Sequence, residues 1–362
     1  MRVIVKIGTS SLTSDSGEVN ISALSKLVAE VVVARTQGHE IVVVTSGAIT
    51  AGVQKLGIVR PEEPEILQAL SAVGQIDLMR AYGEEFGSHG VAIGQVLLAP
   101  HDFRDRNQYL HAETTFDHLL RLDVVPIVNE NDAVADDAIR YGDNDRIAAL
   151  VANLLRADLL VLLTDTPGVL TADPRIEPSA TLIEEIAAID QAIEEVAGNA
   201  GSRGSGGMAS KLAAARMASW SGVRTVIAAA DRSEVLAEAI AGISGIGTAV
   251  PAREARVAAR KLWIGFAVTP HGQVTVDDGA AEALSHSGGS LLIAGITRTE
   301  GSYSQDDAVD VANLSGEVFA KGLVAFDSET MERWKGSRAE ELPADISPVA
   351  IHRDDLVILE EP

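Results

Sequence analysis

Two lysines stand at positions where the sequence could bind and transfer a phosphate group. Lys6 lies two residues before Gly8, and Lys211 closes the glycine-rich stretch Gly204–Lys211, G-S-G-G-M-A-S-K. Backbone amides beside glycine and a mobile ammonium group both suit phosphate oxygens. The order differs from a P-loop, because Ser210 comes before the lysine rather than after it. Lys211 begins a helix-like run, so amides and ammonium could converge on a phosphate at a helix N-terminus.

Acidic residues follow several apolar runs and add to this interpretation. Asp132, Asp143, Asp145 and Asp165 all stand at such positions, and acids near a phosphate site commonly hold Mg²⁺. Each has an ordinary alternative, since aspartates also cap helices and a lysine can simply end a strand on the surface. Their recurrence at successive strand ends favours the phosphate site. The sequence contains no G-x-S-x-G or H-E-x-x-H motif and no histidine spacing typical of a metal site.

The elements that must position these residues alternate along the first two-thirds of the chain. Short β-branched or apolar runs predict strands at Val3–Ile7, Glu40–Val44, Val91–Leu98, Val124–Val128, Leu159–Leu163 and Arg224–Ala228. Helical patterns are predicted at Ile21–Thr36, Asp105–Leu122, Asp145–Leu155 and Met208–Ser221. Apolar strands alternating with helices are typical of a parallel sheet covered on both faces. Ligands of such sheets bind at the carboxyl ends of the strands.

The pattern changes after about Gly247 and predicts a second domain. Pro251–Lys261 is charged and alanine-rich, as a linker or connecting helix would be. Beyond it, short strand candidates at Gln273–Val276, Ser290–Ile293, Ala308–Val311 and Val318–Ala320 are separated by Gly, Asp and Ser. We expect an α/β domain at 1–250, a linker at 251–262 and a small, mostly β domain at 263–362.

Composition excludes several classes of protein. The 362 residues are 46% hydrophobic, enough for a large core, and they include no cysteine, which excludes disulfides and thiolate chemistry. The formal charge of −23 argues against nucleic acid as a partner. The N-terminus reads as a strand and lacks the apolar stretch of a signal peptide. No apolar run reaches membrane-spanning length. We expect a cytoplasmic protein that does not bind membranes.

Six motifs, in order along the chain, resemble the glutamate 5-kinases of the amino-acid kinase superfamily. They are Val5–Thr13, Val44–Ile49, Val124–Asp132, Tyr141–Asp145, Leu162–Arg175 and Gly204–Lys211. Three further segments, Gly272–Leu284, Ser290–Ile296 and Phe319–Val324, resemble a PUA domain. The resemblance implies an amino-acid-kinase-like α/β fold, with a mainly parallel sheet sandwiched by helices, followed by a small, mostly β PUA barrel.

The resemblance also implies a reaction and its residues. ATP would phosphorylate the side-chain carboxylate of L-glutamate, the first step of proline biosynthesis, with Mg²⁺ arriving on the nucleotide and no metal ligands in the chain. The implied catalytic residues are Lys6, Lys211 and Asp145. The implied ATP-binding residues are Lys6, Gly8, Thr9, Ser10, Thr164, Asp165, Ser205, Gly206, Gly207, Met208, Ala209, Ser210 and Lys211. The implied glutamate-binding residues are Ser46, Gly47, Asn129, Asp132 and Asn144. Family members imply a homo-oligomer, a dimer or tetramer, and a reductase as the enzyme that receives the product.

Two alternatives remain open from the sequence. A PUA domain raises the possibility of an RNA-binding or regulatory protein, but residues 263–362 carry 18 acidic and 6 basic side chains, a net charge of −12 that opposes RNA binding. A sister kinase for another carboxylate, such as aspartate or N-acetylglutamate, would differ mainly in the shape of its pocket.

Overall fold

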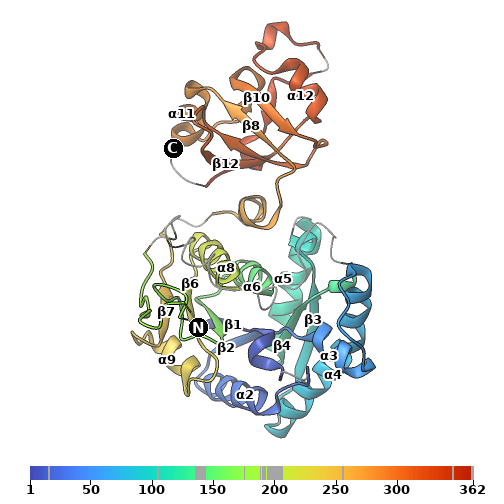
Figure 1. Ribbon diagram of the computed structural model, residues 1–362, viewed down its shortest axis with the longest axis vertical. Helices are drawn as coiled ribbons and strands as arrows, with labels where there is room; N and C mark the ends of the chain where they lie inside the picture. The colour runs from blue at the N-terminus through green and yellow to red at the C-terminus, as the bar shows by residue number, and fades with distance from the viewer. Residues whose placement is uncertain are drawn as a thin grey trace. The chain divides into compact units, whose positions relative to one another are not determined.

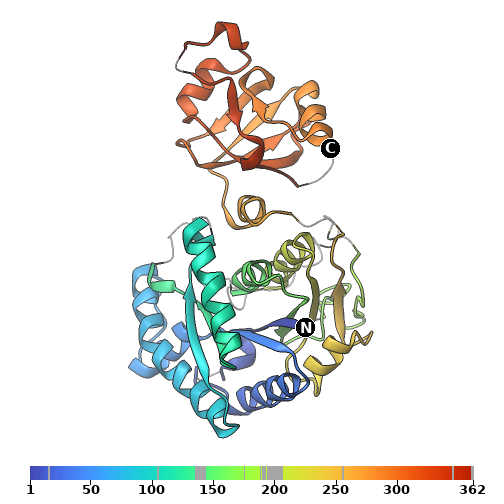
Figure 2. The same cartoon turned by 180° about the vertical axis from the view of Figure 1, so that it is seen from behind.

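The computed structural model describes residues 1–14, 17–103, 106–134, 144–174, 176–187, 189, 193, 207–254, 257–344 and 346–359. The chain divides into two compact units, Met1–Arg256 and Val257–Pro362. The predicted linker at 251–262 spans the point where the chain passes from one unit to the next. Helices and strands of both units are drawn in Figures 1 and 2.

A seven-stranded sheet forms the centre of the first unit, in the order β3-β4-β2-β1-β5-β6-β7. Its strands are β1 (Arg2–Ile7), β2 (Glu40–Val44), β3 (Ile93–Leu98), β4 (Val125–Glu130), β5 (Leu159–Thr164), β6 (Arg224–Ala229) and β7 (Gly247–Val250). Every neighbouring pair is parallel except β6 with β7, which is antiparallel. The chain adds strands on one side of β1 and then returns to its other side with β5. The carboxyl ends of β1 and β5 therefore form a topological switch point, where sheets of this kind bind ligands.

Helices cover both faces of this sheet (Figures 1 and 2). They are α1 (Thr9–Leu12), α2 (Ile21–Thr36), α3 (Ala48–Leu56), α4 (Pro64–Ser88), α5 (Arg106–Arg121), α6 (Asn144–Leu154), α8 (Met208–Trp220) and α9 (Val235–Ala241). Short 3-10 turns lie at Pro100–Phe103 and Asp132–Val134. On one face, α2, α4 and α9 share a buried core with alternate residues of the strands, such as Val3, Val5 and Ile7 of β1. Because side chains alternate along a strand, Lys6 points to the opposite face, toward α6 and α8.

The strand predictions agree with the structure to within a few residues, and the exception is informative. The strand predicted to end at Val128 continues as β4 through Asn129 and Glu130, both of which are buried. Both residues are held by hydrogen bonds inside the protein, Asn129 through its side chain and Glu130 through its backbone N–H. Helices α3 and α4, which no sequence pattern indicated, are also present.

Close packing of α3 against α4 depends on two glycines. A Cβ at Gly74 would lie 1.9 Å from the carbonyl oxygen of Ala48, and one at Gly52 would lie 2.0 Å from that of Leu70. Contacts this short with backbone atoms cannot be relieved by side-chain motion, so any larger residue would push the helices apart. The two backbones therefore approach each other directly at this crossing (Figure 1).

The second unit is built around an open five-stranded sheet in the order β10-β8-β11-β12-β14, with a separate pair β13-β9. Its strands are β8 (Gly272–Val276), β9 (Leu291–Leu292), β10 (Ile296–Gly301), β11 (Ala308–Ala312), β12 (Val318–Leu323), β13 (Val349–Ile351) and β14 (Leu356–Ile358). Its helices are α10 (Ala259–Leu262), the π-helical turn Trp263–Ala267, α11 (Asp278–Ser287) and α12 (Ser328–Trp334), with 3-10 turns at Ile293–Gly295, Ala339–Glu341 and Arg353–Asp355. Pairing is antiparallel apart from β8 with β11. The unit has its own buried cluster, which includes Val274, Phe319 and Ile351.

Among the described residues, no helix is both long enough and apolar enough to cross a membrane.

Candidate functional site

Lys6 and Lys211 meet at a single buried carboxylate. The Nζ of Lys6, the second-last residue of β1, lies 2.6 Å from Oδ1 of Asp145. The Nζ of Lys211, in the first turn of α8, lies 3.2 Å from Oδ2 of the same residue. All three side chains are buried: Lys6 is 3% exposed, Lys211 4% and Asp145 0%. The structure thus places two positive charges from distant parts of the chain at the carboxyl end of the sheet.

The ionisation of Asp145 is set by two opposing effects. Burial raises the pKa of its carboxyl group, but the ammonium groups of Lys6 and Lys211 outweigh burial, and the pKa lies below its ordinary value. Ser210 adds a hydrogen bond, with its Oγ donating to Oδ2 at 3.2 Å. Asp145 therefore stays ionised and fixes the two ammonium groups relative to each other.

Two short backbone segments lie beside this cluster. Gly8 is the N-cap of α1, whose first residues Thr9 and Ser10 follow it directly. Gly207 occupies the N-cap of α8, where no side chain makes a capping hydrogen bond. Met208, Ala209 and Ser210 form the first turn of that helix. The predicted ATP-binding residues Ser205 and Gly206 lie outside the described residues.

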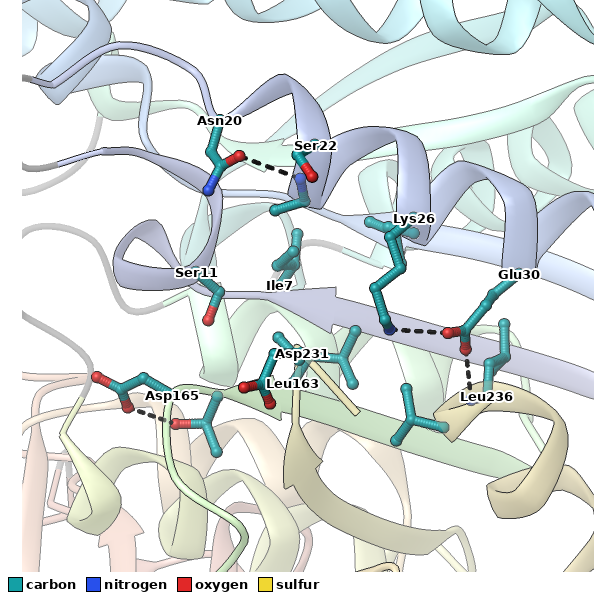
Figure 3. Close-up of a pocket in the computed structure, with 15 residues that line it drawn as sticks. Ile7, Ser11, Asn20, Ser22, Lys26, Glu30, Leu163, Asp165, Asp231 and Leu236 are labelled. Carbon is teal, nitrogen blue, oxygen red and sulfur yellow. Dashed lines mark hydrogen bonds and ion pairs between the residues drawn. The ribbon is translucent and has the colours of Figure 1, made fainter. Parts of the chain in front are cut away.

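The predicted nucleotide residues are Thr164, which ends β5, and Asp165, which follows it; both line a cavity of about 460 Å³ (Figure 3). Thr164 donates a hydrogen bond to Asp165, from Oγ1 to Oδ1 at 3.2 Å. The cavity lies between α2 and α9 and also contacts Ile7, Lys26, Glu30, Asp231 and Leu236. Lys6 and Lys211 do not line this cavity. Ile7 does, and Lys6 points to the opposite face of the sheet, where it meets Asp145 together with Lys211. This cavity and the paired lysines are therefore adjacent but distinct.

A second group of polar residues surrounds the end of β4. The backbone N–H of Glu130 donates to Oδ1 of Asn129 and to Oδ1 of Asn144, both at 3.0 Å. Asn144 is the first residue of α6 and the neighbour of Asp145. This pair of hydrogen bonds thus links the predicted glutamate-binding amides to the lysine cluster.

Ser46 and Gly47 stand at the start of α3, at the end of the neighbouring strand β2. Gly47 is its N-cap with a φ of 101°, in the left-handed region where other residues are strained. A Cβ there would also lie 3.2 Å from Cγ2 of Thr13. The backbone conformation therefore favours glycine at this turn, and a larger residue would also crowd Thr13.

Asp132 has a buried carboxylate that is only partly satisfied. It is 6% exposed, and its Oδ2 accepts a hydrogen bond of 2.5 Å from Oγ of Ser71. Its Oδ1 is buried without a hydrogen-bond partner among the described residues. Burial raises the pKa of Asp132, and the hydrogen bond from Ser71 offsets part of that effect.

The structure adds three residues of α4 that the sequence prediction missed. Ser71 binds Asp132, Gln75 accepts a hydrogen bond from Asn129 at 2.8 Å, and Tyr82 donates one to Thr45 at 2.9 Å. All three are buried. Their spacing of four and seven residues puts them on one stripe of the helix. The sequence signal that could have identified these residues is a row of polar residues at helical spacing within an otherwise apolar helix.

Among the described residues, no group of three or more His, Asp or Glu side chains is arranged to hold a metal ion.

Comparison with known proteins gives concordant results for both units. Residues 1–229 match the amino acid kinase family, and residues 272–345 match the PUA domain. The glutamate 5-kinase of Paraburkholderia phymatum is 43% identical over 364 residues, which cover 99% of this chain and 98% of that protein. The glutamate 5-kinase of Caldanaerobacter subterraneus is 42% identical over 366 residues, with the same coverage.

Among solved structures, the carbamate kinase from Giardia lamblia bound to AMP-PNP is similar in fold. It has a TM-score of 0.51 at 15% identity and covers 70% of this chain and 98% of its own. Together with the family matches, this likeness confirms the predicted architecture, a mainly parallel sheet between helices followed by a PUA domain.

Proposed function

Since the chain belongs to the amino acid kinase family and, within it, to the glutamate 5-kinases, we propose that it transfers the γ-phosphoryl group of ATP to the side-chain carboxylate of L-glutamate. The product is the acyl phosphate L-glutamyl 5-phosphate, the first intermediate toward proline. The observation that carries this proposal is the meeting of Lys6 and Lys211 at Asp145.

The chemistry needs charge neutralisation rather than a general base. A glutamate side chain with a pKa of about 4.3 is already ionised at neutral pH, so the nucleophile has no proton to lose. The barrier comes from bringing a carboxylate in line with a phosphoryl group that is itself negatively charged. Lys6 and Lys211 supply positive charge where negative charge develops in the transition state. Asp145 holds the two ammonium groups in fixed positions relative to each other.

ATP is held at the helix termini beside the lysines. Backbone amides of Gly8, Thr9 and Ser10 and of the segment Ser205–Ser210 donate to its phosphate oxygens, as helix N-termini favour anions. Thr164 and Asp165 bind the nucleotide from the end of β5. Mg²⁺ would arrive with ATP, whose phosphate oxygens are ligands that this ion prefers, and would neutralise part of their negative charge.

Glutamate is recognised at its α-carbon by the residues at the end of β4. The buried carboxylate of Asp132 pairs with the α-ammonium group. Its atom Oδ1 can accept this hydrogen bond, because it has no other partner in the described part of the chain. Ser46, Gly47, Asn129 and Asn144 complete the pocket. This arrangement leaves the γ-carboxylate directed toward Lys6.

Hydroxylamine trapping tests the proposal directly. The protein is incubated with ATP, Mg²⁺, hydroxylamine and either L-glutamate, L-aspartate or N-acetyl-L-glutamate, and the hydroxamate is measured. We expect hydroxamate from L-glutamate alone, because it reports an acyl phosphate. Hydroxamate from L-aspartate or N-acetyl-L-glutamate instead would identify a sister kinase, and none from any acid would refute carboxylate phosphorylation.

The chemistry of the product bears on the enzyme that consumes it. An acyl phosphate hydrolyses readily, so the next enzyme must receive it promptly. We expect that enzyme to be the reductase that the family resemblance implies. We expect a cytoplasmic homo-oligomer, a dimer or tetramer. Light scattering of the purified protein distinguishes these states from a monomer.

A further inference from the structure

Helix α4 presents two buried polar side chains to the residues at the end of β4. Ser71 and Gln75 are four residues apart and so lie on the same face of the helix. Their exposed fractions are 5% and 8%, and they bind Asp132 and Asn129, respectively. Asn129 follows Val125 and Ile127 on the face of the sheet that packs against α4. The amino-acid pocket is therefore backed by α4.

A chain of hydrogen bonds fixes the orientation of the Gln75 amide. The backbone N–H of Glu130 can only donate, so the atom of Asn129 that it contacts at 3.0 Å must be the oxygen Oδ1. The amide nitrogen of Asn129 then faces Gln75 and donates to its Oε1 at 2.8 Å. The Nε2 group of Gln75 is left as a donor turned away from Asn129.

That donor is buried and has no hydrogen-bond partner among the described residues. One turn of α4 earlier, Ser71 binds one carboxylate oxygen of Asp132 and leaves the other, Oδ1, likewise without a partner in the described part of the chain. Buried polar groups are nearly always paired in native proteins, so two such atoms around one pocket need an explanation. One is a donor and the other is a negatively charged acceptor.

An α-amino acid supplies the matching pair of groups on a single carbon atom. Its ammonium group fits the Oδ1 of Asp132, and its α-carboxylate, bonded to the same carbon, accepts from a donor nearby. We propose that Gln75 is a substrate-binding residue that donates from Nε2 to the α-carboxylate of the amino acid. This inference rests on the proposed function, since it assumes that glutamate is the acceptor substrate.

Gln75 then determines which acids are accepted. In this arrangement the lysines bind the γ-carboxylate, Asp132 binds the ammonium group and Gln75 binds the α-carboxylate. Losing a hydrogen bond to a charged group typically weakens binding about tenfold to a hundredfold. The loss is expected only for ligands that carry the α-carboxylate.

Two variants separate direct contact from indirect positioning. Gln75→Glu keeps an oxygen to accept from Asn129 but replaces the donor with a second oxygen, whereas Gln75→Leu removes both. Binding of L-glutamate and 4-aminobutyrate, which is glutamate without its α-carboxylate, is measured by calorimetry or by competition. Gln37→Glu, at an exposed position beyond the end of α2, is the matched control.

We expect both Gln75 variants to weaken L-glutamate about tenfold to a hundredfold while changing 4-aminobutyrate less than about threefold. Asp132→Asn should weaken both ligands, because both carry the ammonium group. Equal losses for the two ligands in Gln75→Leu, with no loss in Gln75→Glu, would mean that Gln75 acts only through Asn129 and would overturn the inference. Unchanged binding of L-glutamate in both variants would overturn it as well.

Failure of the inference is distinguishable from failure of the proposed function. The unmodified protein is tested first for hydroxamate formation with L-glutamate, and absence of the product there refutes the function. If the unmodified protein is active and the Gln75 variants do not discriminate between the two ligands, only the role of Gln75 is refuted.

Discussion

At the scale of single residues, the site depends on carboxylates whose ionisation is shifted in opposite directions. Asp145 has a lowered pKa because two buried ammonium groups overcome the effect of burial. Asp132 has a raised pKa because burial exceeds the help it receives from Ser71. Asp145 already has cationic partners in the folded chain, whereas the proposed cationic partner of Asp132 is the ammonium group of the substrate. The pH dependences of the two residues must therefore differ in sign.

Asp145 should make the folded protein sensitive to acid. A carboxyl group whose pKa is lower in the folded than in the unfolded state contributes stability that is present above its ordinary pKa of 3.8. This contribution is lost as the pH falls through the lower, folded-state value. Urea unfolding at a series of pH values should show a steeper loss of stability on acidification for the unmodified protein than for Asp145→Asn. Parallel curves would show that the ion cluster does not contribute in this way.

Asp132 should instead cost stability at neutral pH. A raised pKa means that the folded state prefers the protonated form, so stability declines as the pH rises through the folded-state value. Asp132→Asn removes the buried charge and should raise the Tm of the ligand-free protein at pH 7 by a few degrees, roughly the effect of 1 kcal/mol in a protein of this size. The same variant should lose most of its affinity for glutamate. A lower Tm together with unchanged affinity would contradict the assignment of Asp132.

At the scale of elements, the proposed glutamate site involves both α3 and α4, which approach each other closely. Ser46 and Gly47 start α3, while Ser71 and Gln75 project from α4, so the Gly52–Gly74 crossing sets the distance between the two groups. If these residues bind glutamate as proposed, the packing of the two helices affects substrate binding.

Gly74→Ala tests this coupling. The added methyl group would lie 1.9 Å from a backbone oxygen, so we expect a loss of about 1–3 kcal/mol in stability and an increased KM for glutamate. Gly87→Ala in the same helix is the control, because its Cβ would meet nothing within 4 Å and alanine favours a helix. Urea unfolding and steady-state kinetics measure both effects. Equal behaviour of the two variants would mean that the crossing does not position the pocket.

Some of these elements could be predicted from the sequence and others could not. Strands such as β1, β2 and β5 were predictable because their β-branched and leucine-rich runs are buried on both faces, and their polar ends marked the site. Helix α4 was missed because its buried face includes Ser71, Gly74 and Gln75, residues that resemble a surface or a turn in sequence. Those residues are buried for their hydrogen bonds and for close packing, and neither property follows from hydrophobic periodicity. The lysine cluster was predicted by resemblance, but its geometry required the fold.

At the scale of the whole molecule, two units with separate cores carry an excess of negative charge. The chain has a formal charge of −23. Because the second unit matches the PUA domain, RNA binding is an alternative function to test. Electrostatic attraction to phosphates supplies most of the non-specific affinity of proteins for nucleic acids. The acidic second unit lacks that attraction.

We therefore expect no electrophoretic shift of a structured RNA by the full chain at moderate salt. The measurement includes a basic RNA-binding protein as a positive control, so that a negative result is informative. A shift that persists as the salt concentration rises would show specific recognition and would give the second unit a function that its charge does not suggest.

The central claim, that two distant lysines neutralise the transferring phosphoryl group, is tested most directly by the kinetics of Lys211→Ala. Removing one such group typically lowers kcat by about 100- to 1,000-fold. We predict a loss of this size with little change in the KM for glutamate, while Lys55→Ala, at a side chain that is 52% exposed, should retain normal kcat. A Lys211→Ala enzyme with unchanged kcat would contradict the account.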